Sequence, residues 1–171
     1  MPKIIRRYNS TIHGNYRFAY LKYGLLTGLL MSLYVLVRHW IGCPSATPSD
    51  IGKDVVMIAA MLFFSYLYRR SLGDGMVTFK ELALLGLGIG LVSALVFGLF
   101  VWLYCGIIYP EMTAFYAENF RNDETTAEGF ASAQNPMMWA IFFGFVHTVV
   151  TSIIVAFFSA LIFRTEKGER I

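Results

Sequence analysis

His147 is the residue with the clearest capacity for chemistry, because it is the only ionisable residue well inside an uninterrupted apolar stretch. A polar group in the hydrocarbon core of a membrane is costly unless it is paired, and such residues often have a function. Counted from Pro136, His147 lies about 16 Å along a helix, close to mid-membrane. Thr148, Thr151 and Ser152 follow it and could line a polar cleft or hydrogen-bond across helices. We predict these four as ligand-binding residues; the alternative is a neutral histidine satisfied by a neighbouring carbonyl or hydroxyl.

The remaining reactive residues do not support catalysis. A single histidine is neither a metal site nor a proton pathway, and the apolar spans offer it no carboxylate partner. Cys43 and Cys105 lack metal-ligand spacing; both are expected in the outer half, where either a disulfide or two free thiols is chemically permitted. Gly86, Gly88 and Gly90 lack the strand that a dinucleotide-binding fingerprint requires. We expect no enzyme activity, catalytic residue, metal or cofactor.

Composition indicates a single membrane domain covering residues 1–171. The chain is 57% hydrophobic with a mean hydropathy of +0.58, which is too apolar for an ordinary soluble domain. No stretch shows the alternation of a β-barrel strand, so the expected class is all-α. The net charge of +3 comes from basic residues beside the apolar runs, as expected for membrane orientation. Nucleic acid is therefore not an expected partner, whereas the lipid bilayer is.

Four apolar stretches predict an integral membrane bundle of four transmembrane helices, at about 18–41, 51–68, 82–109 and 136–163. The second is the weakest, because its charge-free part, residues 55–68, is short for a crossing. Lys53 and Asp54 are then expected at the outer interface, where the carboxylate is favoured near a helix N-terminus. The alternative, a re-entrant or interfacial helix, would place the two termini on opposite sides.

Three of these helices carry small residues at four-residue spacing, which lets another helix approach closely. The ridges could pack against the chain itself or against a partner. The predicted packing positions are Gly24, Gly28, Gly86, Gly90, Ala94, Gly98 and Gly144.

The long outer loop, Pro110 to Asn135, contains an amphipathic segment. Met112, Phe115 and Tyr116 fall on one helical face, while the loop as a whole is acidic. We expect this segment to lie at the membrane surface or to cap the bundle. The small, polar part that follows, from residue 125 to 134, is expected to be mobile.

The distribution of basic residues predicts the orientation. An even number of crossings puts both termini and the second connector on one side, which then holds eleven of the fourteen lysines and arginines. That side is cytoplasmic by the positive-inside rule, and Trp40, Trp102 and Trp139 then fall towards the outer interface, where tryptophans are enriched. No small-residue cleavage site follows the basic N-terminal region, so a cleaved signal peptide is not expected.

Four short motifs carry a resemblance to a known family: Leu25 to Gly28, residues 75–90 with Phe79 and Lys80, Tyr109 to Glu111, and Ala160 to Arg164. With these motifs, most of the chain resembles the uncharacterised bacterial family called domain of unknown function 4199, found chiefly in Bacteroidota. The resemblance implies four helices and an inner-membrane location. It implies no catalytic residue, since the family has no assigned activity. It also suggests a family-2 glycosyltransferase as a partner.

Together these observations favour a non-enzymatic accessory or scaffold subunit of an envelope complex, with both termini cytoplasmic. Its partner would be a second copy of the chain or another membrane protein, such as the glycosyltransferase that the resemblance suggests. The alternative is a small transporter or lipid-binding protein with a polar cleft around His147.

Overall fold

The computed structural model describes residues 2–42, 50–72, 77–111 and 136–164, with the side chains of residues 2–17, 136, 137, 139 and 140 left out. Helices make up almost all of this described part, and none of it is a strand. Their bounds are α1, Pro2–Trp40; α2, Ile51–Ser71; α3, Phe79–Leu103; the π-helical turn η1, Tyr104–Ile108; and α6, Pro136–Phe163. The prediction of an all-α fold is confirmed.

Each long helix contains a segment long and apolar enough to cross a membrane, so the chain is a multi-pass membrane protein. These segments are Phe18–Trp40, Ile51–Ser71, Phe79–Ile108 and Ile141–Phe163. Large apolar side chains on the outer faces, such as Leu29, Leu33 and Phe158, are more than half exposed, as expected for contact with lipid. The predicted amphipathic segment in the outer loop lies outside the described residues.

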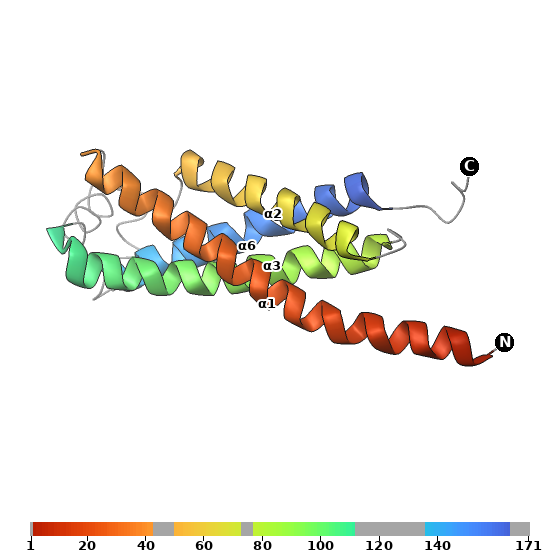
Figure 1. Cartoon of the computed structure of the whole chain (residues 1–171). Coiled ribbons are helices and arrows are strands. Elements are labelled where there is room, and N and C mark those ends of the chain that lie inside the picture. Colours follow the sequence, from red (N-terminus) through yellow and green to blue (C-terminus); the bar gives the residue numbers. More distant parts are fainter. Residues whose placement is uncertain (1, 43–49, 73–76, 112–135, 165–171) are drawn as a thin grey trace, which may run out of the picture.

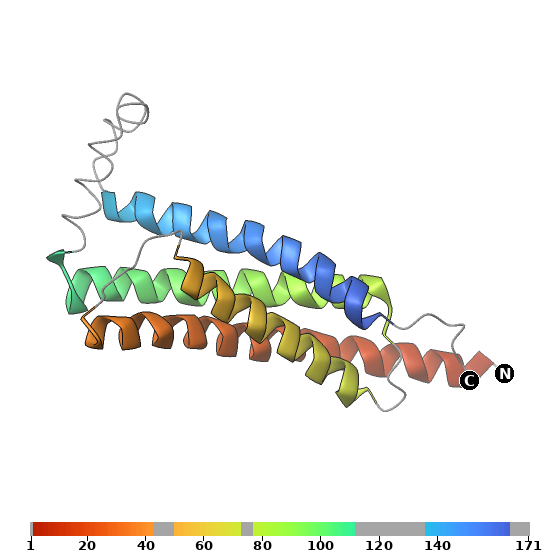
Figure 2. The ribbon, with the colours of Figure 1, turned by 90° about the horizontal axis from the view of Figure 1, so that it is seen from above.

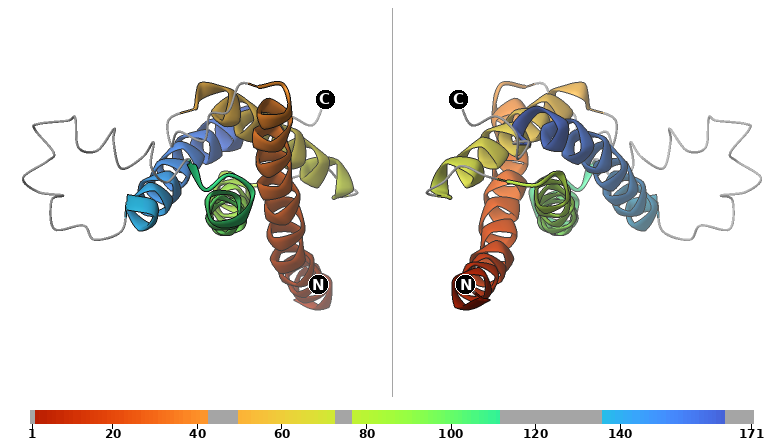
Figure 3. Two further views of the ribbon diagram at one scale, coloured as in Figure 1. Left: turned by 90° about the vertical axis from the view of Figure 1, so that its left-hand side faces the viewer. Right: turned by 90° about the vertical axis from the view of Figure 1, so that its right-hand side faces the viewer.

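Helix α3 lies in the middle of the bundle, between α1 and α6 (Figure 1). Viewed along the bundle, α1, α3 and α6 form a bent row, and α2 lies across one side of it (Figure 3). Helix α2 touches mainly α1 and α6 and has fewer contacts with α3. The helix therefore bridges the two outer members of the row.

The helix ends are arranged as four crossings require. The start of α1, the end of α2, the start of α3 and the end of α6 all lie at one end of the bundle (Figures 1 and 2). Helix α1 begins at Pro2, well before the predicted start at residue 18, and its first half extends beyond the other helices. Residues 3–17 contain no proline and a single glycine, so no strong helix breaker stops the helix there.

The weakest predicted span forms a continuous helix of 21 residues. Its N-cap is Asp50, whose Oδ1 accepts a hydrogen bond from the Gly52 backbone N–H at 2.9 Å. Helix α3 also starts with a side-chain cap. Thr78 and Glu81 form a capping box in which each side chain accepts from the other residue's backbone N–H. These caps fix where α2 and α3 begin, which is at opposite ends of the bundle (Figure 1).

The first glycine ridge lies in the contact between α1 and α3. A Cβ on Gly24 would lie 2.6 Å from Cβ of Val92, and one on Gly28 would lie 2.7 Å from Cβ of Val96. Both glycines therefore accommodate valines of the neighbouring helix. This ridge is occupied within the chain.

The second ridge brings α3 against α6. A Cβ on Gly86 would lie 2.9 Å from the Ala156 Cα, and one on Gly90 would collide with the Ser152 side chain. Ala94, one turn further along, is almost fully buried. The small residues of α3 thus allow close approach of α6.

The two remaining predicted packing glycines have more room. At Gly98 the nearest atom to an added Cβ would be Cγ2 of Ile141, at 3.8 Å. At Gly144 no such atom lies within 4 Å. Four-residue spacing alone did not show which glycines lie in tight contacts.

Candidate functional site

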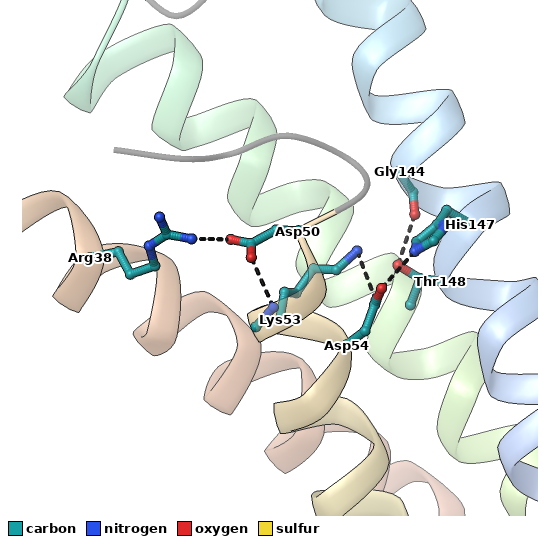
Figure 4. Close-up of polar contacts among 8 residues, drawn as sticks. Arg38, Asp50, Lys53, Asp54, Gly144, His147 and Thr148 are labelled. Atoms are coloured by element: carbon teal, nitrogen blue, oxygen red, sulfur yellow. Dashed lines mark hydrogen bonds and ion pairs between the residues drawn. The ribbon is translucent and has the colours of Figure 1, made fainter. Parts of the chain in front are cut away.

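His147 of α6 faces a carboxylate of α2. Its Nε2 lies 2.9 Å from Oδ2 of Asp54 (Figure 4). The expectation that no carboxylate could partner this histidine is therefore wrong. Asp54 belongs to the first turn of α2, and α6 brings His147 to the same level of the bundle. The contact joins two helices that run in the same direction.

Lys53 approaches the same carboxylate from the interior. Its Nζ lies 3.3 Å from Oδ1 of Asp54 and 5.5 Å from the centre of the Phe97 ring of α3. The Lys53 side chain is only 1% exposed, although the sequence placed it at the outer interface. A carboxylate and an aromatic face both favour an ammonium group, which explains how this lysine is accommodated between α2 and α3.

A second ion pair holds the other side of the α2 N-terminus. Arg38 of α1 places Nη1 2.8 Å from Oδ2 of Asp50 and 3.4 Å from the Tyr34 hydroxyl. Arg38 thus bonds to the residue that caps α2. Figure 4 shows that Asp50 turns towards α1 and Asp54 towards α6. We call Arg38, Asp50, Lys53, Asp54 and His147 the charged cluster.

The charged cluster lies inward from the end of the bundle at which α1 ends. Helix α2 has 21 residues and spans about 31 Å, whereas the 30 residues of Phe79–Ile108 span about 45 Å. Helices α1 and α3 continue towards that end beyond the start of α2 (Figure 1). Arg38, Lys53, Asp54 and His147 all belong to membrane-crossing segments, where ionic side chains are uncommon and are usually paired.

The members of the cluster differ in exposure. His147 is the most open, at 37%, followed by Arg38 at 30%. Asp54 is 18% exposed, Asp50 is 8% exposed and Lys53 is buried. The site thus has accessible groups on both sides of α2 and a buried ammonium group between them.

Two of the three predicted neighbours of His147 on α6, Thr148 and Ser152, have their hydroxyls turned to their own helix. Thr148 Oγ1 donates to the Gly144 carbonyl at 2.8 Å, and Ser152 Oγ donates to the Val149 carbonyl at 2.7 Å. Thr148 and Ser152 are buried, while Thr151 is half-buried. The structure does not gather these hydroxyls around His147, so their role in ligand binding stays a prediction.

The sequence reasoning missed the carboxylate because Asp54 is 93 positions from His147 in the chain. Asp54 was treated as a terminal charge of the weakest span. A usable signal was present: an intramembrane histidine needs a partner, and few acidic residues are close to a span. Lys53 was likewise expected at the outer interface.

A further polar contact lies nearer the end of the bundle where α1 and α3 end. Nδ1 of His39 and the Tyr104 hydroxyl are 2.9 Å apart, where α3 passes into η1. Cys105, next in the chain, is a buried free thiol, and Cys43 lies outside the described residues. Across the described ranges, no group of three or more histidines, cysteines or acidic residues could hold a metal ion.

A family model described as "Protein of unknown function (DUF4199)" matches residues 22–165. The matched range includes all four membrane-crossing segments except the first few residues of the first one, and it contains the whole charged cluster. No curated protein and no solved structure matches the chain.

Proposed function

The chain belongs to the DUF4199 family, whose description assigns no activity, so we propose a function from its own geometry: a small membrane binding or transport protein. Its site is the charged cluster, and its ligand is a polar solute or a lipid headgroup. The observation that carries this proposal is the placement of Asp54 between His147 and the buried Lys53. Ionisable groups inside membrane proteins commonly mark substrate or ion pathways.

The exposure of His147 favours binding over a purely structural role. A buried ion pair that only holds helices together is often replaceable by apolar residues without loss of stability. Here the histidine leaves more than a third of its side chain accessible, next to a carboxylate and an ammonium group. A ligand could contact His147 without first separating α2 from α6.

The first experiment is mass determination of the intact protein, purified from its native membranes in gentle detergent at natural abundance. We expect a defined lipid or small molecule to remain bound to the wild-type chain. His147→Ala should lose it, because the accessible member of the cluster is gone. Ser159→Ala is the matched control: Ser159 lies on the same helix, is buried and donates to its own helix at 3.0 Å.

Equal retention by the wild type and His147→Ala would contradict the proposal, as would a wild-type chain that carries no ligand. A second protein in stoichiometric amount would instead support the accessory-subunit function, with or without a glycosyltransferase as the partner. One argument for the accessory-subunit function no longer holds, because the tight glycine ridges are filled by helices of the same chain.

We also propose that the protein lies in a bacterial inner membrane with both termini in the cytoplasm and that it is not an enzyme. The positive-inside rule supports the orientation, since most lysines and arginines lie towards one end of the bundle. The proposal that it is not an enzyme is supported by the sequence alone, in which we find no catalytic motif.

A further inference from the structure

The first half of α1 extends past the rest of the bundle. The helix begins at Pro2, whereas its membrane-crossing segment begins only at Phe18. In Figures 1 and 2 no other helix runs beside the part that continues past the end of α2 and the start of α3. Residues 2–17 amount to about 24 Å of helix at 1.5 Å per residue. A helix of this length is marginal in water without a surface on which to pack its apolar side.

Apolar and basic residues fall on opposite sides of this half of α1. The residues at four-residue spacing along one side are apolar or aromatic: Ile4, Tyr8, Ile12 and Tyr16. The lysine and the arginines of this half fall on the opposite side of the helix: Lys3, Arg6, Arg7 and Arg17. This pattern is typical of a basic amphipathic helix that lies in the plane of a membrane interface, with its apolar side towards the acyl chains.

The charge of the segment indicates which surface it fits. Residues 1–17 contain four lysines or arginines and no acidic residue, and the first acidic residue of the whole chain is Asp50. Anionic headgroups attract clustered basic residues that lie near a bilayer surface. Because residue 18 starts a membrane-crossing segment, the preceding residues are held next to such a surface by the chain itself. Lipid is therefore the favoured occupant of this helix.

We propose that residues 2–17 form a membrane-surface helix that binds anionic phospholipid headgroups through its basic side. Gly14 is the weakest helix former between Lys3 and Arg17, so a bend there would let the helix lie along the bilayer. The inference is independent of the charged cluster, whose member on α1, Arg38, lies in the last turn of that helix. The other possible occupants are an acidic protein and a second copy of this chain.

The test uses the full-length chain with Cys43→Ser and Cys105→Ser, embedded in nanodiscs and labelled with nitrobenzoxadiazole at one new cysteine. Ile12→Cys places this polarity-sensitive fluorophore on the apolar side, and Ser10→Cys places it on the basic side. One set of nanodiscs contains phosphatidylcholine alone, and the other contains phosphatidylglycerol as well. Quenching by nitroxide groups on lipid acyl chains reports contact with the bilayer interior.

We expect phosphatidylglycerol to shift the emission of the Ile12→Cys probe to shorter wavelength and to make it sensitive to the acyl-chain quencher. The Ser10→Cys probe should respond much less, because it lies on the side that faces the headgroups and water. Raising the salt concentration should weaken the response of the same sample, since attraction between exposed charges is screened.

Charge variants identify the residues responsible. Arg6→Gln combined with Arg7→Gln should weaken surface binding by about tenfold or more, because each basic residue adds to the attraction for an anionic bilayer. The matched control is Arg69→Gln combined with Arg70→Gln, which removes the same charge from the last turn of α2 at the same end of the bundle. We expect the control to leave the response of the Ile12→Cys probe unchanged.

The proposal is overturned if the Ile12→Cys probe gives the same signal in both lipid compositions, or if the control pair abolishes the response as fully as the Arg6 and Arg7 pair. A response that follows the ratio of protein to lipid, and not the phosphatidylglycerol content, would assign a second copy and overturn it. Protection in native membranes but not in vesicles of their extracted lipids would assign a protein partner and overturn it too. None of these outcomes bears on the charged cluster, which the intact-mass experiment tests separately.

Discussion

The charge of Lys53 must be compensated by neighbouring groups, because its side chain is the least exposed in the charged cluster. Its ammonium group is buried beside Asp54 and above the Phe97 ring. Desolvation of an ammonium group is repaid only when an opposite charge is held close by. Asp54 therefore has two roles: its carboxylate compensates the positive charge of Lys53, and it also orients the His147 ring.

Asp54→Ala is expected to lower the free energy of unfolding by about 3 kcal/mol or more, because it leaves a buried cation without that carboxylate. The measurement is reversible unfolding in mixed micelles, followed by far-UV circular dichroism. Adding Lys53→Met to the same chain should recover part of the loss, since an apolar side chain of similar length needs no counter-charge.

Lys80→Met is the matched control, because Lys80 is exposed at the start of α3. We expect it to change stability by no more than about 0.5 kcal/mol. If Asp54→Ala changed the free energy of unfolding as little as this control, the ion pair of Asp54 with Lys53 would not contribute to stability. A double variant less stable than Asp54→Ala alone would also contradict the role given to Lys53.

The sequence identified His147 as the residue to watch but not what it contacts. Its local surroundings are apolar, and the contact with Asp54 arises only when α2 and α6 pack together. Periodicity reports which face of a helix is apolar, and it carries no information about the level at which two distant helices meet. The four-helix architecture was predictable because it depends on local apolar length, whereas the site depends on packing between helices.

Among the helices, the close approach of α3 and α6 depends on particular glycines rather than on the ridge as a whole. Gly86 faces the backbone of Ala156, which cannot move aside without shifting α6. Gly98, on the same helix, meets only the Ile141 side chain at an ordinary contact distance. The sequence pattern treated both positions alike, since both fall on the same four-residue repeat.

Gly86→Ala is expected to destabilise the bundle by about 1–3 kcal/mol, the usual effect of overpacking a tight contact. Gly98→Ala is expected to be neutral or slightly stabilising, because an alanine there has room and is a better helix former. Both are measured by the same micelle unfolding assay. Equal effects of the two substitutions would show that the α3 and α6 contact is looser than described.

Across the molecule as a whole, the shared level of the helix ends gives the orientation a direct test. The end of α2 and the start of α3 lie with the start of α1, and the end of α1 and the start of α2 lie towards the opposite end (Figure 1). Basic residues are concentrated at the first of these ends. The orientation therefore predicts which single positions a membrane-impermeant reagent can reach from outside.

In a chain with Cys43→Ser and Cys105→Ser, we expect Gly42→Cys to react with an impermeant maleimide added to intact bacterial cells. Ser71→Cys should react only after the inner membrane is permeabilised. Gly42 lies just after α1 and Ser71 ends α2. Labelling of Ser71→Cys but not of Gly42→Cys in intact cells would show that the orientation is the opposite of the one proposed. Labelling of both positions in intact cells would contradict the crossing of the membrane by α2.

The position of Asp54 and His147 in the chain also bears on how the protein is made. Synthesis delivers α2 to the membrane long before α6, and α2 carries two charges in its first turn and a half. Until α6 is translated, Asp54 has no histidine to meet, and only the adjacent Lys53 can neutralise it. The contact between Asp54 and His147 can therefore form only after α6 is translated, whereas the contacts of α2 with α1, including the ion pair of Arg38 with Asp50, need no part of α6.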